Sequence, residues 1–204
     1  MHAPPLDGFE QFWHSDGQTK RPVYWTGNID DPPVVLLHEL PGMIAECVDL
    51  GRRLHQAGFC VFMPLLFGRP EPGPVESAAY TALVCIRREF TLFATGKPSP
   101  IADWVRGLCH EASQRCGGQK VGLIGMCLTG GFGLLLAIDP IVDAPVLSQP
   151  SLPLPLSTRH RRDLGLDPDG LQRLDRRVAD DGLEILGMRF TGDRLCPPER
   201  FDEL

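Results

Sequence analysis

The stretch KVGLIGMCLTGGFGLLLAI, residues 120–138, decides the fold. An apolar run that predicts a strand over 120–126 stops at Cys127, and a glycine-rich apolar run that predicts a helix over 128–138 resumes at once. A strand that ends in a sharp turn and leads directly into a helix is the setting of a nucleophile elbow. The sequence therefore leaves two interpretations of Cys127: a nucleophilic thiol at a strand end, or a small apolar spacer in the core.

The residues around Cys127 suit the nucleophilic interpretation. Gly125 leaves room where a side chain would clash with the turn, and Gly130 and Gly131 follow in the pattern G-x-C-x-T-G-G. The helix N-terminus beneath the sulfur carries a partial positive charge that favours a thiolate, and free amides that favour an oxyanion. A free thiol with a pKa of about 8.5 is only about 3% thiolate at pH 7, so the motif leaves open which residue takes its proton.

Strands and helices alternate on both sides of this stretch. Strands are expected at 22–25, 32–40, 59–67, 144–149 and 186–193, helices at 43–57, 77–94, 99–116 and 167–181, and loops at 68–76 and 151–160. Continuous apolar runs such as VVLL, residues 34–37, are typical of parallel strands that are buried on both faces. The alternation predicts an α/β protein with a mostly parallel, doubly wound sheet and helices on both faces.

In such a sheet the functional residues lie at the carboxyl ends of the strands. The side chains expected there are His38, Glu39 and Leu40 after one strand, Cys127 after another, Ser148 and Gln149 after a third, and Asp193 and Arg194 after the last.

Length and composition restrict the function classes. The 204 residues suit one α/β domain, residues 1–204. A net charge of −6 without a basic stripe argues against nucleic acid. No apolar run approaches the roughly 18 residues that a membrane span requires, so no membrane partner is expected.

The seven cysteines are scattered, odd in number and without a C-x-x-C pair. This pattern predicts neither a disulfide framework nor a zinc site, and no metal or cofactor is implied. The N-terminus MHAPPLDGFE has no features of a secretory signal. Reduced thiols fit a cytoplasmic protein.

The stretch VGLIGMCLTGGFG is similar to the nucleophile region of the dienelactone hydrolases, a cysteine branch of the α/β-hydrolase fold. Three further segments resemble that family in order and spacing: VVLLHELPG at 34–42, FCVFMPLLFG at 59–68 and RFTGDRLCP at 189–197. The resemblance extends over nearly everything from about residue 22 to residue 198. It implies the α/β-hydrolase fold and a hydrolase that needs no cofactor.

The resemblance also implies roles for individual residues. Cys127 would be the nucleophile, Asp193 the acid that orients a histidine, and Glu39 the carboxylate that meets the thiol and deprotonates it when substrate binds. The backbone amides of Leu128 and Leu40 would form the oxyanion hole. The candidates for gripping a substrate carboxylate are Arg87 and Arg88.

Each assignment has an alternative. Glu39 would otherwise be a cap or a partner of Arg52 or Arg53, and Asp193 would only shape a turn. Arg87 and Arg88 would lie on a helix surface and pair with Glu89 or Glu76. Thr129 departs from the glycine of the family pattern. His38 precedes Glu39 on a strand, so it should face away from the thiol and bond within its loop, while His160 lies in a polar, arginine-rich segment.

The catalytic histidine of an α/β-hydrolase follows the acid in chain order, but no histidine follows Asp193. The interpretation favoured is that the final strand, the final helix and the triad histidine are missing from this chain. Such a chain should be a poor catalyst and should expose apolar surface.

The function expected is the cleavage of a small ester or lactone through an acyl-enzyme on Cys127. One alternative is a non-catalytic binding protein of the same fold, which the missing histidine favours. The other is a redox-sensing thiol protein in which Cys127 pairs with Cys196. The natural substrate, the pathway and the choice between monomer and homodimer stay open.

Overall fold

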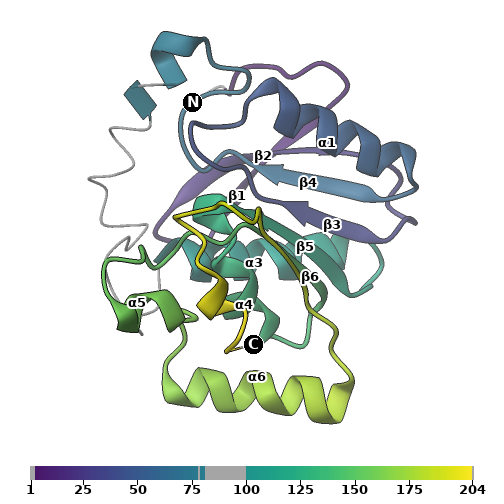
Figure 1. The fold of residues 1–204 in the computed structure, drawn as a ribbon. Helices are drawn as coiled ribbons and strands as arrows, with labels where there is room; N and C mark the ends of the chain where they lie inside the picture. The colour runs from purple at the N-terminus through teal and green to yellow at the C-terminus, as the bar shows by residue number, and fades with distance from the viewer. Residues whose placement is uncertain (1–2, 78, 81–99, 204) are drawn as a thin grey trace.

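The computed structural model describes residues 3–77, 79–80 and 100–203 (Figure 1). In these residues seven strands form one sheet, in the order β1-β2-β4-β3-β5-β6-β7. The strands are β1 (Glu10–Ser15), β2 (Lys20–Thr26), β3 (Pro33–Leu36), β4 (Cys60–Pro64), β5 (Val121–Met126), β6 (Val142–Ser148) and β7 (Leu186–Met188). β1 and β2 run antiparallel to their neighbours, and β4, β3, β5, β6 and β7 pair in parallel. The predicted mostly parallel sheet is confirmed.

Helices cover both faces of the sheet, as expected for parallel strands whose two faces are both apolar. On one face α1 (Ala45–Gln56) packs its Cys47 and Val48 against Val61 and Met63 of β4. On the other face α3 (Pro100–Arg115) and α4 (Phe132–Ala137) pack against a separate apolar cluster. Other helical elements are α5 (Thr158–Arg162), α6 (Pro168–Asp181) and the 3-10 turns η2 (Cys127–Thr129) and η3 (Pro198–Arg200).

The connections that follow β3 and β5 identify the end of the sheet where a ligand-binding site is expected. From β3 the chain passes through α1 to β4 on one side, and after β4 it returns through α3 to β5 on the other side of β3. The chain therefore leaves these two neighbouring strands in opposite directions. In open α/β sheets ligands bind at such a switch point, outside the carboxyl ends of the strands.

The observed elements differ from the expected ones in several places. β1 was not expected, because EQFWHS has no apolar alternation. Among the described strands it pairs only with β2, at the sheet edge, and most of its side chains are partly exposed. The strand expected at 186–193 stops at Met188, because Asp193 closes a turn by donating its amide to the Phe190 carbonyl. The helix expected at 128–138 is divided into η2 and α4, and the loop expected at 151–160 ends in α5. Most of the helix expected at 77–94 lies outside the described residues.

The edge strand β7 leaves apolar side chains in solvent. Leu186 is 55% exposed and Met188 46%, and Phe190 just beyond the strand is 70% exposed. Exposed apolar surface of this kind favours association. Within residues 3–77, 79–80 and 100–203, no helix combines the length and the hydrophobicity that a bilayer span needs.

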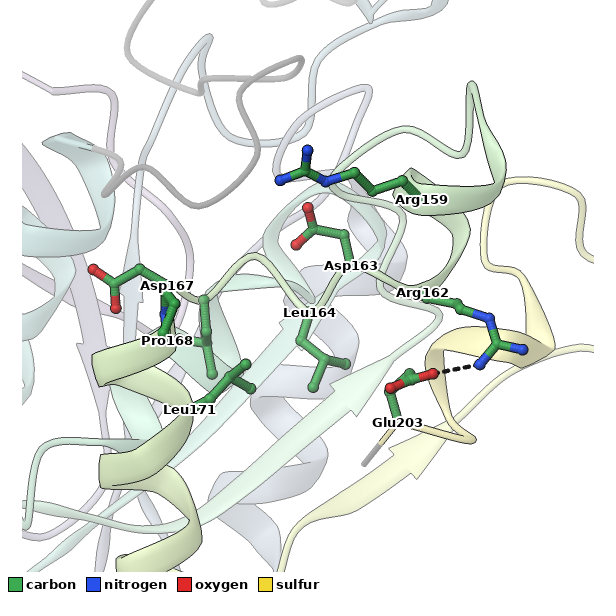
Figure 2. Close-up of a pocket in the computed structure, with 9 residues that line it drawn as sticks. Arg159, Arg162, Asp163, Leu164, Asp167, Pro168, Leu171 and Glu203 are labelled. Carbon is green, nitrogen blue, oxygen red and sulfur yellow. Dashed lines mark hydrogen bonds and ion pairs between the residues drawn. The ribbon is translucent and has the colours of Figure 1, made fainter.

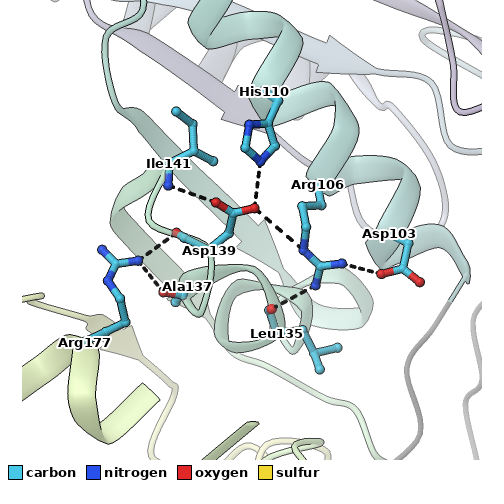
Figure 3. Close-up of polar contacts among 8 residues, drawn as sticks. All are labelled: Asp103, Arg106, His110, Leu135, Ala137, Asp139, Ile141 and Arg177. Carbon is cyan, nitrogen blue, oxygen red and sulfur yellow. Dashed lines mark hydrogen bonds and ion pairs between the residues drawn. The ribbon is translucent and has the colours of Figure 1, made fainter. Parts of the chain in front are cut away.

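A buried arginine joins α6 to the end of α4 (Figure 3). Arg177 is 6% exposed, and it donates hydrogen bonds to the carbonyls of Ala137 at 2.9 Å, Asp139 at 2.7 Å and Val142 at 3.1 Å. The last carbonyls of a helix have no partner within the helix, so a buried helix end needs such donors. The guanidinium thus caps α4 and fixes α6 beside the sheet.

The carboxylate of Asp139 is held in the same cluster. It accepts hydrogen bonds from the Ile141 amide at 3.0 Å and from His110 at 2.7 Å. Burial alone would raise its pKa, but these bonds outweigh burial, and the pKa of Asp139 lies below its ordinary value. A carboxyl group with a lowered pKa stabilises the fold above its unfolded pKa, and this contribution is lost as the pH falls through the folded pKa.

We expect Arg177→Ala to lower the free energy of unfolding by about 2–4 kcal/mol, because three buried carbonyls would lose a charged donor. Urea unfolding measures the change. The matched control is Arg176→Ala. Arg176 is exposed, and among the described residues its hydrogen bonds go only to Gln172 one turn away, so its loss should stay within about 0.5 kcal/mol. Equal unfolding midpoints for the two variants would show that the Arg177 contacts do not stabilise the fold.

Candidate active site

Cys127 stands where β5 turns into η2, and its backbone is strained. Its φ is +48°, a value that residues with a side chain rarely adopt and that costs about 1–3 kcal/mol. Gly125 makes the turn possible: a Cβ on Gly125 would lie 2.4 Å from the carbonyl oxygen of Thr129. The strand, the sharp turn and the half-buried thiol are those of a nucleophile elbow.

The side chain of Thr129 closes the elbow. Its buried hydroxyl accepts a hydrogen bond from the Met126 amide and donates one to the Met126 carbonyl, both at 3.0 Å. This reciprocal pair ties the two residues that flank Cys127 and Leu128. The threonine that departs from the family glycine therefore has a structural role of its own.

Glu39 reaches Cys127 because β3 and β5 lie side by side. Leu36 is level with Ile124, and continuing this parallel register brings Glu39 level with Cys127. The thiol and the half-buried carboxylate hydrogen-bond each other, and Gln149 at the end of β6 hydrogen-bonds the same carboxylate. Glu39 therefore interacts with the thiol and not with Arg52, the alternative partner, because Arg52 pairs with Asp49.

The surroundings raise the pKa of both groups. Burial raises the pKa of Glu39, although its hydrogen bonds with Gln149 and Cys127 oppose the rise. Burial also raises the pKa of the Cys127 thiol, and the negative charge of Glu39 adds to the rise. Hydrogen bonds from the Ser151 hydroxyl and the Leu128 amide act in the opposite direction. At rest the pair therefore favours a neutral thiol beside a carboxylate.

The two amides expected to form the oxyanion hole belong to Leu128, which follows β5, and to Leu40, which lies in the loop after β3. The Leu128 amide belongs to the first turn after the elbow and hydrogen-bonds the sulfur. In the part of the chain that the structure describes, the Leu40 amide donates no hydrogen bond. Backbone amides at such a strand end are the kind of donor that stabilises an oxyanion.

His38 is not a base for the thiol. It is fully buried, its Nε2 accepts the Leu66 amide at 3.0 Å, and its Nδ1 lies 3.2 Å from the carbonyl oxygen of Glu39. Burial lowers the pKa of His38 to about 4. The imidazole is therefore neutral. It bonds within its own loop at Glu39, as expected from the sequence, and it also bonds Leu66 in the loop after β4, which was not expected.

Asp193 lies in the turn after β7, and its Oδ1 accepts the amides of Leu195 at 2.8 Å and Cys196 at 3.0 Å. Its Oδ2 has no hydrogen bond within the described ranges. In the same ranges no hydrogen bond or ion pair joins a histidine to Cys127 or to Asp193. The other described histidines pair elsewhere or lie in solvent: His14 with Glu111, His110 with Asp139, His160 with Ser157, and His55 exposed.

The other described thiols are less suited to react. Cys47, Cys60, Cys109, Cys116 and Cys196 are buried, and Cys127 alone of the six described cysteines is partly exposed. Burial raises the pKa of Cys196 to about 11, and its charged neighbours are Arg200, Asp193 and Arg189. Among the described residues Cys127 and Cys196 share no contact, so nothing in the geometry favours their pairing.

Sequence reasoning missed one partner of the thiol. Ser151 is 5% exposed, and its Oγ lies 3.4 Å from the Cys127 Sγ. It stands in a proline-rich loop, where no periodic pattern marks a functional position. Arg87 and Arg88, the candidates for holding a substrate carboxylate, lie outside the described residues.

A separate cavity of about 590 Å³ opens between α5 and the start of α6 (Figure 2). Its lining combines apolar Leu164 and Leu171 with charges of both signs, and Arg162 pairs there with Glu203 at 2.5 Å. Neither Cys127 nor Glu39 lines it. The cavity is therefore not part of the candidate active site.

The fold and the elbow define an α/β-hydrolase. The model of the dienelactone hydrolase family matches residues 23–162, so this chain belongs to the dienelactone hydrolase family, a family of hydrolases. The resemblance stated from the sequence is confirmed.

Solved structures agree on the fold. A candidate dienelactone hydrolase from Klebsiella pneumoniae is 16% identical with a TM-score of 0.56, and the match covers 97% of this chain and 95% of that one. A dienelactone hydrolase from Anabaena variabilis is 16% identical with a TM-score of 0.54, over 93% and 89% of the two chains. The dienelactone hydrolase-like promiscuous phosphotriesterase P91 from metagenomic libraries is 17% identical with a TM-score of 0.50, over 88% and 80%. No curated protein sequence matches the chain.

We expect Glu39→Gln to lower the pKa of the Cys127 thiol by about one unit, because the substitution removes a negative charge beside the sulfur. The rate of iodoacetamide labelling of Cys127, followed by peptide mapping across a pH series, reports the midpoint. Glu46→Gln on the exposed start of α1 is the charge-matched control and should leave the midpoint unchanged. If the Glu39→Gln curve coincides with that of the wild type, the carboxylate does not control the thiol.

Proposed function

We propose that this chain hydrolyses a small ester or lactone with Cys127 as its nucleophile. The observation that carries the proposal is the interaction of one half-buried thiol with both the Glu39 carboxylate and the Leu128 amide, at the switch point of the sheet. Placing the nucleophile, a proton acceptor and an oxyanion donor together is the recurring arrangement of acyl-transfer enzymes.

The first step is the activation of the thiol. When substrate enters, the S–H proton passes to the Glu39 carboxylate, and the sulfur lone pair attacks the carbonyl carbon of the ester. The raised pKa of Glu39 makes it a better proton acceptor than an ordinary carboxylate. The transfer also removes the negative charge that opposed a thiolate.

The second step is the stabilisation of the charge that develops on the substrate oxygen. The amides of Leu128 and Leu40 are the proposed donors to this oxyanion. Removing one such donor from an acyl-transfer enzyme typically costs about 10²–10³ in rate. When the tetrahedral intermediate collapses, the C–O bond breaks and the alcohol leaves with the proton that Glu39 took. The acyl group then stays on Cys127 as a thioester.

The third step is the hydrolysis of the thioester. Water attacks the acyl carbon, the carboxylic acid is released, and the sulfur regains its proton. A triad histidine oriented by Asp193 would serve this step, and Asp193 stays the proposed acid because its Oδ2 has no partner in the described ranges. Among those residues no histidine contacts either group, so deacylation by this chain should be slow.

That same observation favours a second candidate function, a non-catalytic protein that binds a small molecule at the elbow. Such a protein would keep the fold and the elbow but would form no acyl-enzyme. The two candidates differ in whether Cys127 forms a covalent bond with an ester. Family membership implies a small-molecule ligand in either case, and fold alone does not specify which one.

The test is the release of p-nitrophenol from p-nitrophenyl acetate by the 204-residue chain. We expect a burst that approaches one equivalent per thiol site, followed by slow turnover, because acylation needs only Glu39 and the amides whereas deacylation lacks a positioned base. A positioned base typically contributes about 10²–10⁴ in rate.

Cys127→Ala should abolish the burst. Cys47→Ala should keep it, since Cys47 is a buried thiol near Glu39 but not on the elbow. A burst of the same size in wild type and Cys127→Ala would overturn the assignment of the nucleophile. A wild-type chain that shows no burst but binds the ester would favour the binding protein.

A further inference from the structure

The loop that follows β6 folds back over the elbow and attaches to Cys127 twice. The Ser151 amide donates a hydrogen bond to the Cys127 carbonyl at 3.0 Å, and the Ser151 Oγ lies 3.4 Å from the Cys127 Sγ. The serine is 5% exposed. A buried hydroxyl with the nucleophile as its partner is placed to act on the sulfur.

The loop can lie so close because residue 130 is glycine. A Cβ on Gly130 would stand 2.8 Å from the Pro150 Cα and 3.1 Å from the Ser148 carbonyl oxygen. Any side chain at this position would push the loop away from the elbow. The glycine in the motif therefore serves the approach of Ser151 as well as the turn itself.

A buried arginine fixes the loop from the other side. Arg200 is 1% exposed, and its guanidinium donates to the carbonyls of Pro150 and Pro153, both at 2.6 Å. A third bond goes to the His160 carbonyl at 3.1 Å. Hydrogen bonds from a charged donor are about twice as strong as neutral ones, so the loop is held firmly in place.

The same loop also serves the carboxylate. Gln149 has a φ of +42°, its amide donates to the Met188 carbonyl at 2.7 Å, and its side chain hydrogen-bonds Glu39. A strained backbone at a non-glycine residue persists only where its surroundings impose it. The loop thus gives each member of the Cys127–Glu39 pair one polar partner.

We propose that Ser151 is a further catalytic residue of the hydrolase, and that its O–H donates a hydrogen bond to the Cys127 sulfur as the thiol proton passes to Glu39. The proton of Ser151 stays on its own oxygen, so the step transfers one proton only, from sulfur to carboxylate. The hydrogen bond from this hydroxyl offsets part of the free-energy cost of desolvating the thiolate. The role rests on the proposed function, because it assists the attack of the same thiol.

The test compares the pH dependence of Cys127 labelling by iodoacetamide in Ser151→Ala and wild type. The loss of the donor should raise the midpoint by about one pH unit, which makes labelling at pH 7 about tenfold slower. This direction is opposite to the one expected for Glu39→Gln, so a general loosening of the site would not produce both results. Urea unfolding of each variant identifies loss of the fold.

Two further variants complete the test. Ser151→Thr keeps the hydroxyl and should restore the wild-type midpoint. Ser148→Ala removes a half-buried hydroxyl from the same strand end, where it makes no hydrogen bond in the described ranges, and should not move the midpoint. An unchanged or lowered midpoint in folded Ser151→Ala would overturn the role of Ser151.

The p-nitrophenyl acetate burst separates this failure from failure of the proposed function. If the burst persists on Cys127 while the Ser151→Ala midpoint stays at the wild-type value, the nucleophile assignment stands and the serine has no role. If the midpoint rises but no burst occurs in wild type, Ser151 tunes a thiol that does not perform acyl transfer, which overturns the catalytic role.

Discussion

The backbone of Cys127 adopts a left-handed conformation that residues with a side chain disfavour. The arrangement of the site depends on neighbouring residues that hold this conformation in place. A φ of +48° lifts the thiol to the end of β5 and starts the next helix beneath it. The turn closes only because Gly125 leaves space for the Thr129 carbonyl and because the Thr129 hydroxyl bonds back to Met126. Strain of about 1–3 kcal/mol is typical of functional sites, where the rest of the fold maintains it.

The sheet topology brings the chemical partners to this turn. β3 delivers Glu39 and β6 delivers the loop with Ser151, one from each neighbouring strand of β5. None of these side chains would indicate a site by itself, and the Glu39 carboxylate opposes ionisation of the Cys127 thiol. In the proposed mechanism the half-buried thiol stays neutral at rest and loses its proton to Glu39 when substrate binds. The order of the strands therefore determines which side chains lie next to the Cys127 thiol.

The sequence predicts the parts of this arrangement that follow from local patterns. Continuous apolar runs identify β3 and β4 because both faces of these strands are buried. The G-x-C-x-T-G-G motif identifies the elbow at the end of β5. β1 escapes prediction because an antiparallel edge strand needs no apolar alternation. Ser151 escapes because its role depends on a loop folding back across the sheet, and a contact between residues 127 and 151 leaves no local pattern. The turn of Asp193 is visible as TGD, but its hydrogen bonds to Leu195 and Cys196 are not.

The central claim is that Cys127 carries the acyl group. The most direct measurement is peptide mapping by mass spectrometry after the chain is mixed with p-nitrophenyl acetate and quenched in acid, which preserves a thioester. The account predicts one acetyl group on the peptide that contains Cys127, removable by hydroxylamine. An acetyl group found only on other residues, or none on Cys127 at any time before the quench, would contradict it.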